Sequence, residues 1–200
     1  MINLSNLVFK QIAKRLILGS HPRDFLLEML PENSIGMEIG VHLGDFSQEI
    51  LEKVKPKELH LVDPWKYEKS DAYNKALYGG KRGINQNNMD KRYEKILNRF
   101  ESEINDKKII VHRTDSTVLN NFEDNYFDWI YIDGNHLYEY VKMDIELSHP
   151  KVKKNGYITG DDYHSFGWWK GGVTKAVDEF ETKNLAKLIK IKSNQFIFQK

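Results

Sequence analysis

Short runs of apolar residues alternate along the chain with segments long enough to form helices. The runs at 34–39, 58–63, 108–112, 127–132 and 157–159 are the predicted strands. A strand followed by a helix-length connection and another strand describes a βαβ step, whose two strands are parallel. Repetition of this step predicts a doubly wound α/β domain with a mostly parallel sheet.

Two further apolar runs, at 185–191 and 195–198, follow a helix predicted over 173–182. Only a short polar turn separates the two runs, which favours an antiparallel hairpin at the edge of the sheet. The hairpin brings the predicted sheet to seven strands. We therefore expect one α/β domain over residues 34–200.

The N-terminal segment, residues 1–33, has a different pattern. Apolar residues recur at helical spacing among polar ones, at Leu4, Leu7, Val8, Ile12 and Leu16. This spacing predicts an amphipathic helix, and a second short helix is expected over 23–30. We expect the segment to pack on the α/β domain, with a second subunit of a homo-oligomer as the alternative partner of its first helix.

Residues 64–88 depart from the alternating pattern. The stretch contains Trp65, Tyr67, Tyr73 and Tyr78, and a glycine-rich sequence at 79–83. Loops of this length in a small domain are usually functional or disordered, and the aromatic residues argue against disorder. We predict a substrate-side insertion that is partly helical over 71–77 and leads into a helix over 89–100.

Composition and charge exclude several classes of protein. Two hundred residues, 40% of them hydrophobic and 30% charged, are typical of one globular domain. The formal net charge of +1 gives no general reason to expect nucleic acid as a partner, and the lack of cysteine excludes thiolate metal sites and disulfides. No apolar run approaches the roughly eighteen residues of a membrane-spanning helix. Charged residues interrupt the apolar N-terminus, so we expect no signal peptide and a cytoplasmic protein.

Acidic residues follow two of the predicted strands. Asp133 comes directly after the fourth strand, and Asp161 and Asp162 follow the fifth. Neighbouring parallel strands lie about 4.8 Å apart, so these carboxylates can converge on one ion at the carboxyl edge of the sheet. Three carboxylates favour a hard cation such as Mg²⁺. The alternative is that the aspartates only cap turns or helices.

A glycine turn follows the first strand, with glycines at positions 36, 40 and 44. The dinucleotide pattern G-x-G-x-x-G and the phosphate-binding pattern G-x-x-x-x-G-K-[ST] are both absent. A nucleoside ligand without phosphates is therefore favoured, and Asp63 after the second strand is suited to the hydroxyls of its ribose. The alternative is that the glycines only turn the chain and Asp63 caps a loop.

These motifs together resemble a known family. The sequence from Glu38 to Gly44 resembles motif I of the class I S-adenosylmethionine-dependent methyltransferases. The pattern Ile-Asp-Gly-x-His-x-Tyr at 132–138, followed by Gly-Asp-Asp-Tyr at 160–163, is similar to the methyltransferase-24 group, which includes macrocin-type sugar O-methyltransferases and cephalosporin-hydroxylase-like relatives. The resemblance covers about 35–181 and implies a Rossmann-like methyltransferase fold. His42 departs from it, since many methyltransferases have glycine there, and the 64–88 insertion matches no pattern.

The resemblance implies positions for S-adenosylmethionine as the cofactor. The motif I residues would border its methionine part, the acid after the second strand would hold the ribose, and residues after the second and third strands would border the adenine. The implied residues are Glu38, Gly40, Gly44, Asp63, Trp65, Asp115 and Ser116, and Pro64 is the alternative to Trp65 beside the adenine.

Methyl transfer to a hydroxyl also requires a group that removes the hydroxyl proton. A divalent cation on the three aspartates would bind the acceptor oxygen and lower its pKa. His136, at the start of the helix after Asp133, is the candidate base, and the resemblance implies the same residue. His164 is its rival.

The sequence thus predicts a metal-assisted O-methyltransferase that acts on a small hydroxylated acceptor, with sugars among the candidates. Two other classes stay open. One is an oxidoreductase with a nucleotide cofactor, or a hydroxylase-like relative, and the missing G-x-G-x-x-G disfavours a nicotinamide enzyme. The other is a module that binds the cofactor without catalysis.

Overall fold

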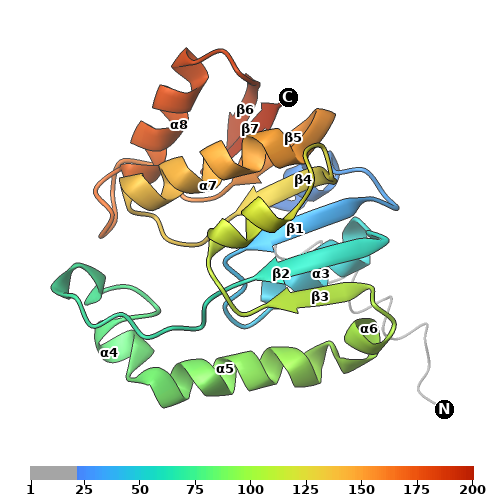
Figure 1. Ribbon diagram of the computed structural model, residues 1–200. Helices are drawn as coiled ribbons and strands as arrows, with labels where there is room; N and C mark the ends of the chain where they lie inside the picture. The colour runs from blue at the N-terminus through green and yellow to red at the C-terminus, as the bar shows by residue number, and fades with distance from the viewer. Residues whose placement is uncertain (1–21) are drawn as a thin grey trace, which may run out of the picture.

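A seven-stranded sheet crosses the molecule, with helices on both faces, in this computed structural model, which describes residues 22–200 (Figure 1). The strands are β1 Ile35–Ile39, β2 Glu58–Val62, β3 Ile109–His112, β4 Phe127–Ile132, β5 Val152–Gly160, β6 Lys187–Lys192 and β7 Gln195–Gln199. The α-helices are α2 Asp24–Leu27, α3 Asp45–Lys53, α4 Gly80–Gly83, α5 Gln86–Arg99, α6 Glu101–Asn105, α7 Tyr138–Lys151 and α8 Gly172–Thr182, and the 3-10 helices are η1 Asp71–Tyr73 and η2 Ser116–Asn121.

The strands lie in the order β3-β2-β1-β4-β5-β7-β6. Strands β1 to β5 pair in parallel, and β7 runs antiparallel between β5 and β6. This arrangement confirms the predicted fold class, including the C-terminal hairpin. The strand order reverses between β1 and β4, and in open α/β sheets a ligand crevice lies beyond the carboxyl ends of the strands at such a point.

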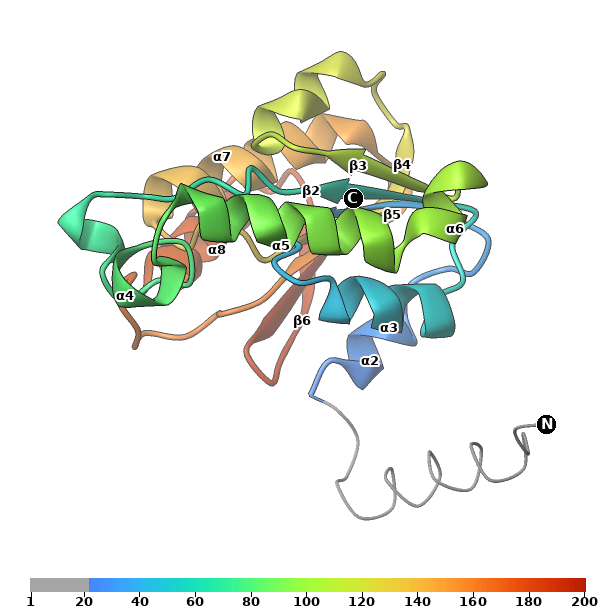
Figure 2. The ribbon, with the colours of Figure 1, turned by 90° about the horizontal axis from the view of Figure 1, so that it is seen from below.

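Alternate side chains of the strands supply two separate cores. Leu61 of β2 and Tyr131 of β4 are buried on the face covered by α3 and α5. Ile130 and Ile132 of β4 are buried on the opposite face, against α7 and α8. Figure 2, which views the sheet from its β3 edge, shows α3 below the strands and α7 above them. Successive strand residues point to opposite faces, so strands buried on both sides are apolar throughout, which is why the sequence located them.

Several connections differ from those predicted. Helix α5 begins earlier than expected, because the Asn85 side chain caps it by accepting a hydrogen bond from the backbone N of Asn88 at 3.1 Å. Helix α7 includes Pro150 in its last turn, and β5 begins at Val152, earlier than the strand predicted over 157–159. Within the segment predicted to be partly helical, 71–77, only the 3-10 helix η1 forms, and the short helix α4 follows over Gly80–Gly83.

Residues that precede β1 pack on the same face of the sheet as α3. Helix α2 is shorter than the predicted 23–30, but Leu26 and Leu27 are buried in the same core as Ile50 of α3. Lys53 Nζ donates a hydrogen bond to Asp24 Oδ1 at 2.5 Å. The amphipathic helix predicted over residues 4–16, and the subunit contact suggested for it, lie outside the described residues.

Candidate functional site

The turn after β1 places Gly40 directly against the end of β4. Gly40 has a φ of +95°, and a Cβ atom at this position would lie 2.0 Å from the carbonyl oxygen of Asp133. The backbone N of Gly40 donates to the carbonyl of Val62 at 2.9 Å, and that of Asp133 donates to the carbonyl of Ile39 at 2.7 Å. Only glycine fits a positive φ and such a close approach. The motif glycine therefore brings the ends of β1, β2 and β4 together.

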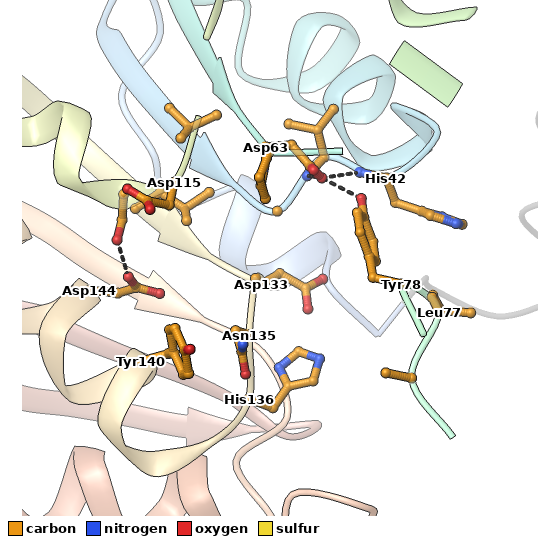
Figure 3. Close-up of a pocket in the computed structure, with 18 of the residues that line it drawn as sticks. His42, Asp63, Leu77, Tyr78, Asp115, Asp133, Asn135, His136, Tyr140 and Asp144 are labelled. Carbon is orange, nitrogen blue, oxygen red and sulfur yellow. Dashed lines mark hydrogen bonds between the residues drawn. The ribbon is translucent and has the colours of Figure 1, made fainter. Parts of the chain in front are cut away.

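A cavity of about 660 Å³ lies at these strand ends (Figure 3). Small-molecule sites in proteins typically measure roughly 300–1,000 Å³, so the cavity is large enough for a nucleoside cofactor. Its wall contains residues of the predicted cofactor site and of the predicted acceptor site. These residues are Glu38, Gly40, Asp63, Asp115, Ser116, Asp133, His136 and Asp162.

Asp63 lies just past β2 and is only 1% exposed. Its Oδ2 accepts hydrogen bonds from the backbone N of Val41 and of His42, each at 3.0 Å, and its Oδ1 accepts one from the backbone N of Trp65 at 2.7 Å. The hydroxyl of Tyr78, from the insertion, also donates to Oδ2. Burial raises the pKa of this carboxyl, while the donors act to lower it. The backbone of the glycine turn thus fixes the acid that was predicted to hold the ribose.

Glu38 is a second buried acid in the cavity wall. The hydroxyl of Ser47, on α3, donates a hydrogen bond to Glu38 Oε2 at 2.5 Å. Burial raises the pKa of Glu38 to about 8, and the Ser47 hydrogen bond opposes this increase. At neutral pH the carboxyl is therefore largely protonated, and it can both donate and accept hydrogen bonds.

The cavity extends past β3 to a pair of side chains that includes Asp144, which the sequence analysis missed. The hydroxyl of Ser116 donates to the carboxylate of Asp144, a buried residue of α7. Burial raises the pKa of Asp144 to about 7. Asp115 caps η2 by accepting a hydrogen bond from the backbone N of Thr117 at 3.0 Å. The signal in the sequence was an acid on the otherwise apolar face of a helix, beside Ile145.

Two residues predicted to border the cofactor lie outside the cavity wall. Gly44 precedes α3 with a φ of +76°, and a Cβ there would lie 2.8 Å from the side chain of Ile96 on α5. Trp65 is fully buried, and its indole Nε1 donates to the carbonyl of His42 at 3.0 Å. Close packing fixes Gly44 and Trp65, and of the two residues offered for the adenine side Pro64 is the one that lines the cavity.

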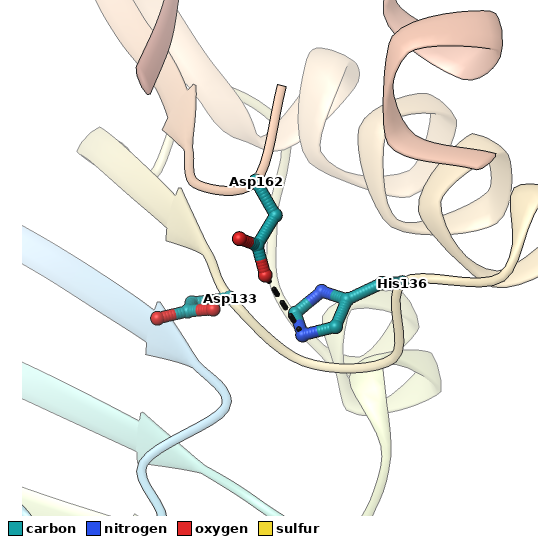
Figure 4. Close-up of side chains that lie close together, drawn as sticks. All are labelled: Asp133, His136 and Asp162. Carbon is teal, nitrogen blue, oxygen red and sulfur yellow. Dashed lines mark ion pairs between the residues drawn. The ribbon is translucent and has the colours of Figure 1, made fainter. Parts of the chain in front are cut away.

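Asp133, His136 and Asp162 lie together at the other end of the cavity (Figure 4). One potential ligand atom from each of the three residues lies within 4.8 Å of the others. His136 Nε2 lies 3.2 Å from Asp162 Oδ2. Burial lowers the pKa of His136, and the neighbouring acids act in the opposite direction. The imidazole is therefore neutral at neutral pH.

Asp161, the third predicted metal ligand, does not line this cavity. Its Oδ2 accepts from the guanidinium of Arg23, and the same Nη2 donates to Asp133 Oδ2 at 3.1 Å. Its Oδ1 accepts from the Gln195 side chain and from the backbone N of Asp162 at 2.7 Å. Successive residues project in different directions, and here only Asp162 of the acidic pair reaches the cavity.

His164, the rival base, contacts the other side of Asp162. Its Nε2 lies 3.2 Å from Asp162 Oδ1, and its ring stacks on Phe166 with a centroid separation of 3.8 Å. Its Nδ1 is buried and has no hydrogen-bond partner among the described residues. His164 does not line the cavity, so within the described chain His136 is better placed to meet an acceptor.

Aromatic side chains enclose the acceptor end of the cavity. Trp168 and Trp169 line it, with ring centroids 6.1 and 4.8 Å from that of His136. Tyr73, from the insertion, lies 5.4 Å from Trp168 and accepts a hydrogen bond from Asn135 Nδ2 at 2.8 Å. The sequence analysis did not single out the two tryptophans, although adjacent aromatics shortly after an acidic strand end were a usable signal.

Residues 37–163 match the model of the Methyltransf_24 family, described as a methyltransferase domain. The matched segment is more than half of the chain, and it contains the glycine turn, Asp63 and the acids of the acceptor end. The chain belongs to this methyltransferase family. With its class I fold, it is an S-adenosylmethionine-dependent methyltransferase, and the cavity at the strand switch point fits that cofactor in size and position.

Solved structures with the same fold include other methyltransferases. A putative caffeoyl-CoA O-methyltransferase from Staphylococcus aureus has a TM-score of 0.60 and 14% identity, over 99% of this chain and 93% of that one. The O-methyltransferase NovP has a TM-score of 0.58 and 17% identity, over 90% of this chain and 79% of that one. A putative methyltransferase from Streptococcus mutans, in complex with SAH, has a TM-score of 0.55 and 15% identity, over 90% and 97%. At these identities the likeness shows a shared fold.

A shorter match links the methyltransferase to an uncharacterized protein of Acanthamoeba polyphaga mimivirus, with 43% identity over 44 residues. The match covers 22% of this chain and 20% of the viral protein. Within residues 22–200, no helix is both long and apolar enough to span a membrane.

Proposed function

We propose that this methyltransferase transfers the methyl group of S-adenosylmethionine to a hydroxyl of a small acceptor. One observation carries the proposal: a single cavity joins the glycine turn and Asp63 to the pair His136 and Asp162. O-methylation requires a methyl donor, an acceptor oxygen and a group that takes the hydroxyl proton, all held in one place. The cavity provides for each of these requirements along its length.

The cofactor half of the cavity is proposed to hold S-adenosylmethionine in one orientation. Asp63 would accept hydrogen bonds from the ribose hydroxyls, and Asp115 and Ser116 would border the adenine. Gly40 and the largely neutral Glu38 would border the methionine part, close to Asp133. When bound, the cofactor supplies a methyl group on a sulfonium. This orientation directs that methyl group toward the acceptor end.

His136 is the proposed general base. Burial holds its pKa below the ordinary value, so the ring is neutral and can accept a proton at neutral pH. Asp162 Oδ2, 3.2 Å from Nε2, orients the ring and stabilises the imidazolium that forms when the proton arrives. The acceptor hydroxyl would lose its proton to His136 as its oxygen bonds to the methyl carbon, while the bond from that carbon to sulfur breaks and S-adenosylhomocysteine leaves.

A divalent cation at the acceptor end is also part of the proposal. Asp133 and Asp162 offer carboxylates to the cavity, and the third ligand is either Asp161, as predicted from the sequence, or His136. Adjacent ligands of an octahedral ion with bonds of about 2.1 Å lie roughly 3 Å apart, close to the 3.2 Å between His136 Nε2 and Asp162 Oδ2. A cation there would bind the acceptor oxygen and lower its pKa. If His136 binds the cation, another group must take the proton.

The proposed acceptor is a small ring compound with free hydroxyls, and a sugar is the leading class. Trp168 and Tyr73 provide flat faces that suit the apolar face of a sugar ring. Lys75 and Arg82 of the insertion also line the cavity and suit an anionic substituent on the acceptor. The shared fold with NovP, an O-methyltransferase, is consistent with an oxygen as the methyl acceptor.

The proposal is tested by a screen of hydroxylated metabolites, including free and nucleotide-linked sugars, with methyl-labelled S-adenosylmethionine. The expected product carries the label in a methyl ether, which mass spectrometry and NMR identify. The variant His136→Ala provides the blank, because it retains the cofactor half of the cavity. A label found only on nitrogen or carbon of the acceptor would contradict O-methylation.

A further inference from the structure

Arg23 brings a positive charge into the acceptor end from a part of the chain that precedes the matched family segment of 37–163. Its Nη2 donates to Asp133 Oδ2 at 3.1 Å and to Asp161 Oδ2. Its guanidinium carbon lies 4.7 Å from the ring centroid of Phe46 and 5.7 Å from that of Tyr131. Two carboxylates and two aromatic faces therefore fix the guanidinium in place.

The same contacts occupy both oxygens of the Asp161 carboxylate. One of its oxygens accepts from Arg23, and the other accepts from Gln195 and from the backbone N of Asp162. Asp133, in contrast, gives one oxygen to Arg23 and still lines the cavity. Asp162 has no contact with Arg23 in the described structure, and its carboxylate faces the two histidines. The three acids are therefore unequal.

We propose that Arg23 is a positioning residue of the acceptor site, which binds Asp161 as an internal counter-ion and withholds it from a divalent cation. The proposal rests on the proposed function, because it concerns the cation of that site. It assigns Asp133 and Asp162 to the cation, with water or acceptor oxygens in the remaining positions. Asp161 supports Arg23, and His136 stays the proposed base. Mn²⁺ suits carboxylate and water oxygens as Mg²⁺ does, and it therefore serves as the probe of this site.

Electrostatics gives the direction of the expected effect. A guanidinium a few ångströms from a cation repels it, and its loss would also free the carboxylate of Asp161 to turn toward the cavity. Replacing Arg23 by a neutral residue should therefore strengthen cation binding. A merely structural arginine would have the opposite effect, because its loss would loosen the acids and weaken any site that they form.

The test measures Mn²⁺ affinity by calorimetry, with neither cofactor nor acceptor present. We expect Arg23→Gln to bind Mn²⁺ at least tenfold more tightly than the wild type, and Arg23→Lys, which keeps the charge, to change far less. The gain should disappear in Arg23→Gln combined with Asp161→Asn. Arg113→Gln, which removes an exposed arginine that pairs with Asp90, controls for net charge and should leave the affinity unchanged.

A second comparison does not require the removal of Arg23, and so it remains informative if Arg23→Gln fails to fold. In the wild-type background, Asp162→Asn should weaken Mn²⁺ binding at least tenfold more than Asp161→Asn does. Equal losses in these two variants, or unchanged or weaker binding in a folded Arg23→Gln variant, would overturn the role of Arg23 and leave the cation itself in place. If Arg23→Gln binds Mn²⁺ tightly and the wild type does not bind it, the role of Arg23 is supported. The wild-type reaction would then proceed without the cation. Absence of Mn²⁺ binding in every variant would overturn both.

Discussion

The hydroxyl of Tyr78 donates a hydrogen bond to Oδ2 of Asp63, the carboxylate that is proposed to bind the cofactor ribose (Figure 3). The other donors to Asp63 are backbone N–H groups, so Tyr78 gives the one side-chain hydrogen bond recorded for this acid within residues 22–200. Arg92 of α5 holds the surrounding insertion, because it donates to the carbonyls of Leu77 and Arg82 at 2.9 and 3.2 Å. Tyr78 and a ribose hydroxyl therefore require the same acceptor.

The variant Tyr78→Phe should bind S-adenosylhomocysteine more tightly than the wild type. Phenylalanine keeps the packing of the ring and removes the competing hydroxyl, so Asp63 gains a free acceptor position in the unliganded protein. A hydrogen bond contributes roughly 0.5–1.5 kcal/mol, which corresponds to an increase in affinity of about two- to tenfold. Isothermal titration calorimetry measures the difference.

Tyr67→Phe is the matched control for this experiment. Tyr67 belongs to the same insertion, but its hydroxyl donates to the carbonyl of Gly80 at 3.4 Å and has no recorded bond to Asp63. Its replacement should leave cofactor affinity unchanged. Weaker binding by Tyr78→Phe would show that the hydroxyl assists the cofactor instead of competing with it.

Replacement of His136 by alanine should lower kcat by about 10²- to 10⁴-fold, the range typical of a lost general base. Affinity for S-adenosylhomocysteine should change little, because His136 lies at the acceptor end of the cavity. His149→Gln, on α7 and outside the cavity wall, is the control and should retain activity. Steady-state rates with the acceptor from the screen give the comparison. Full activity in His136→Ala would transfer the role to His164 or remove it.

Removal of divalent cations by a chelator tests whether the proposed cation takes part in methyl transfer. Treatment with EDTA should abolish methyl transfer, and addition of Mg²⁺ or Mn²⁺ should restore it, because the cation lowers the pKa of the acceptor hydroxyl. Cation affinity of His136→Ala then separates the two roles of this residue. If His136→Ala keeps its affinity for the cation, His136 acts as the base. If the affinity is lost, His136 is a ligand of the cation. Undiminished turnover in EDTA would exclude the cation.

Asp144 should make the stability of the protein depend on pH. Its pKa is about 7 in the folded state and about 3.8 in the unfolded state, so the unfolded state releases this proton first as the pH rises. Its contribution to the free energy of unfolding therefore falls between about pH 4 and pH 7. Relative to Asp144→Asn, the wild type should lose about 2–3 kcal/mol between pH 5 and pH 8. Urea denaturation of both proteins at the two pH values measures this loss.

Glu139→Gln is the control for the pH measurement, because Glu139 is an exposed acid on the same helix. Its difference from the wild type should be nearly the same at pH 5 and pH 8. If Asp144→Asn also showed no change in its difference from the wild type between the two pH values, the buried carboxyl would not titrate in this range.

The sequence predicted the sheet well because each central strand is buried on both faces and is therefore an unbroken apolar run. The same reasoning located Gly40, Asp63 and Asp133, since strand ends at a switch point meet in space whatever the connecting segments do. Residues of the cavity wall could thus be predicted where they lie next to a strand end.

The remaining features depend on contacts between segments that are far apart in the sequence. Arg23 reaches Asp161 across 138 positions, and no local pattern encodes that ion pair. Asp161 and Asp162 are neighbours in sequence, so composition alone could not show that only Asp162 would reach the cavity. Trp65 was expected beside the cofactor because it follows Asp63, but the aromatic core under α5 buries it instead.

The central claim is that the cavity between Gly40 and Asp162 binds S-adenosylmethionine, and calorimetric titration of the full-length protein with S-adenosylhomocysteine and with NAD tests it most directly. The account predicts that one equivalent of S-adenosylhomocysteine binds, that Asp63→Ala weakens this binding, and that NAD produces no heat of binding. Binding of NAD without binding of S-adenosylhomocysteine would contradict it.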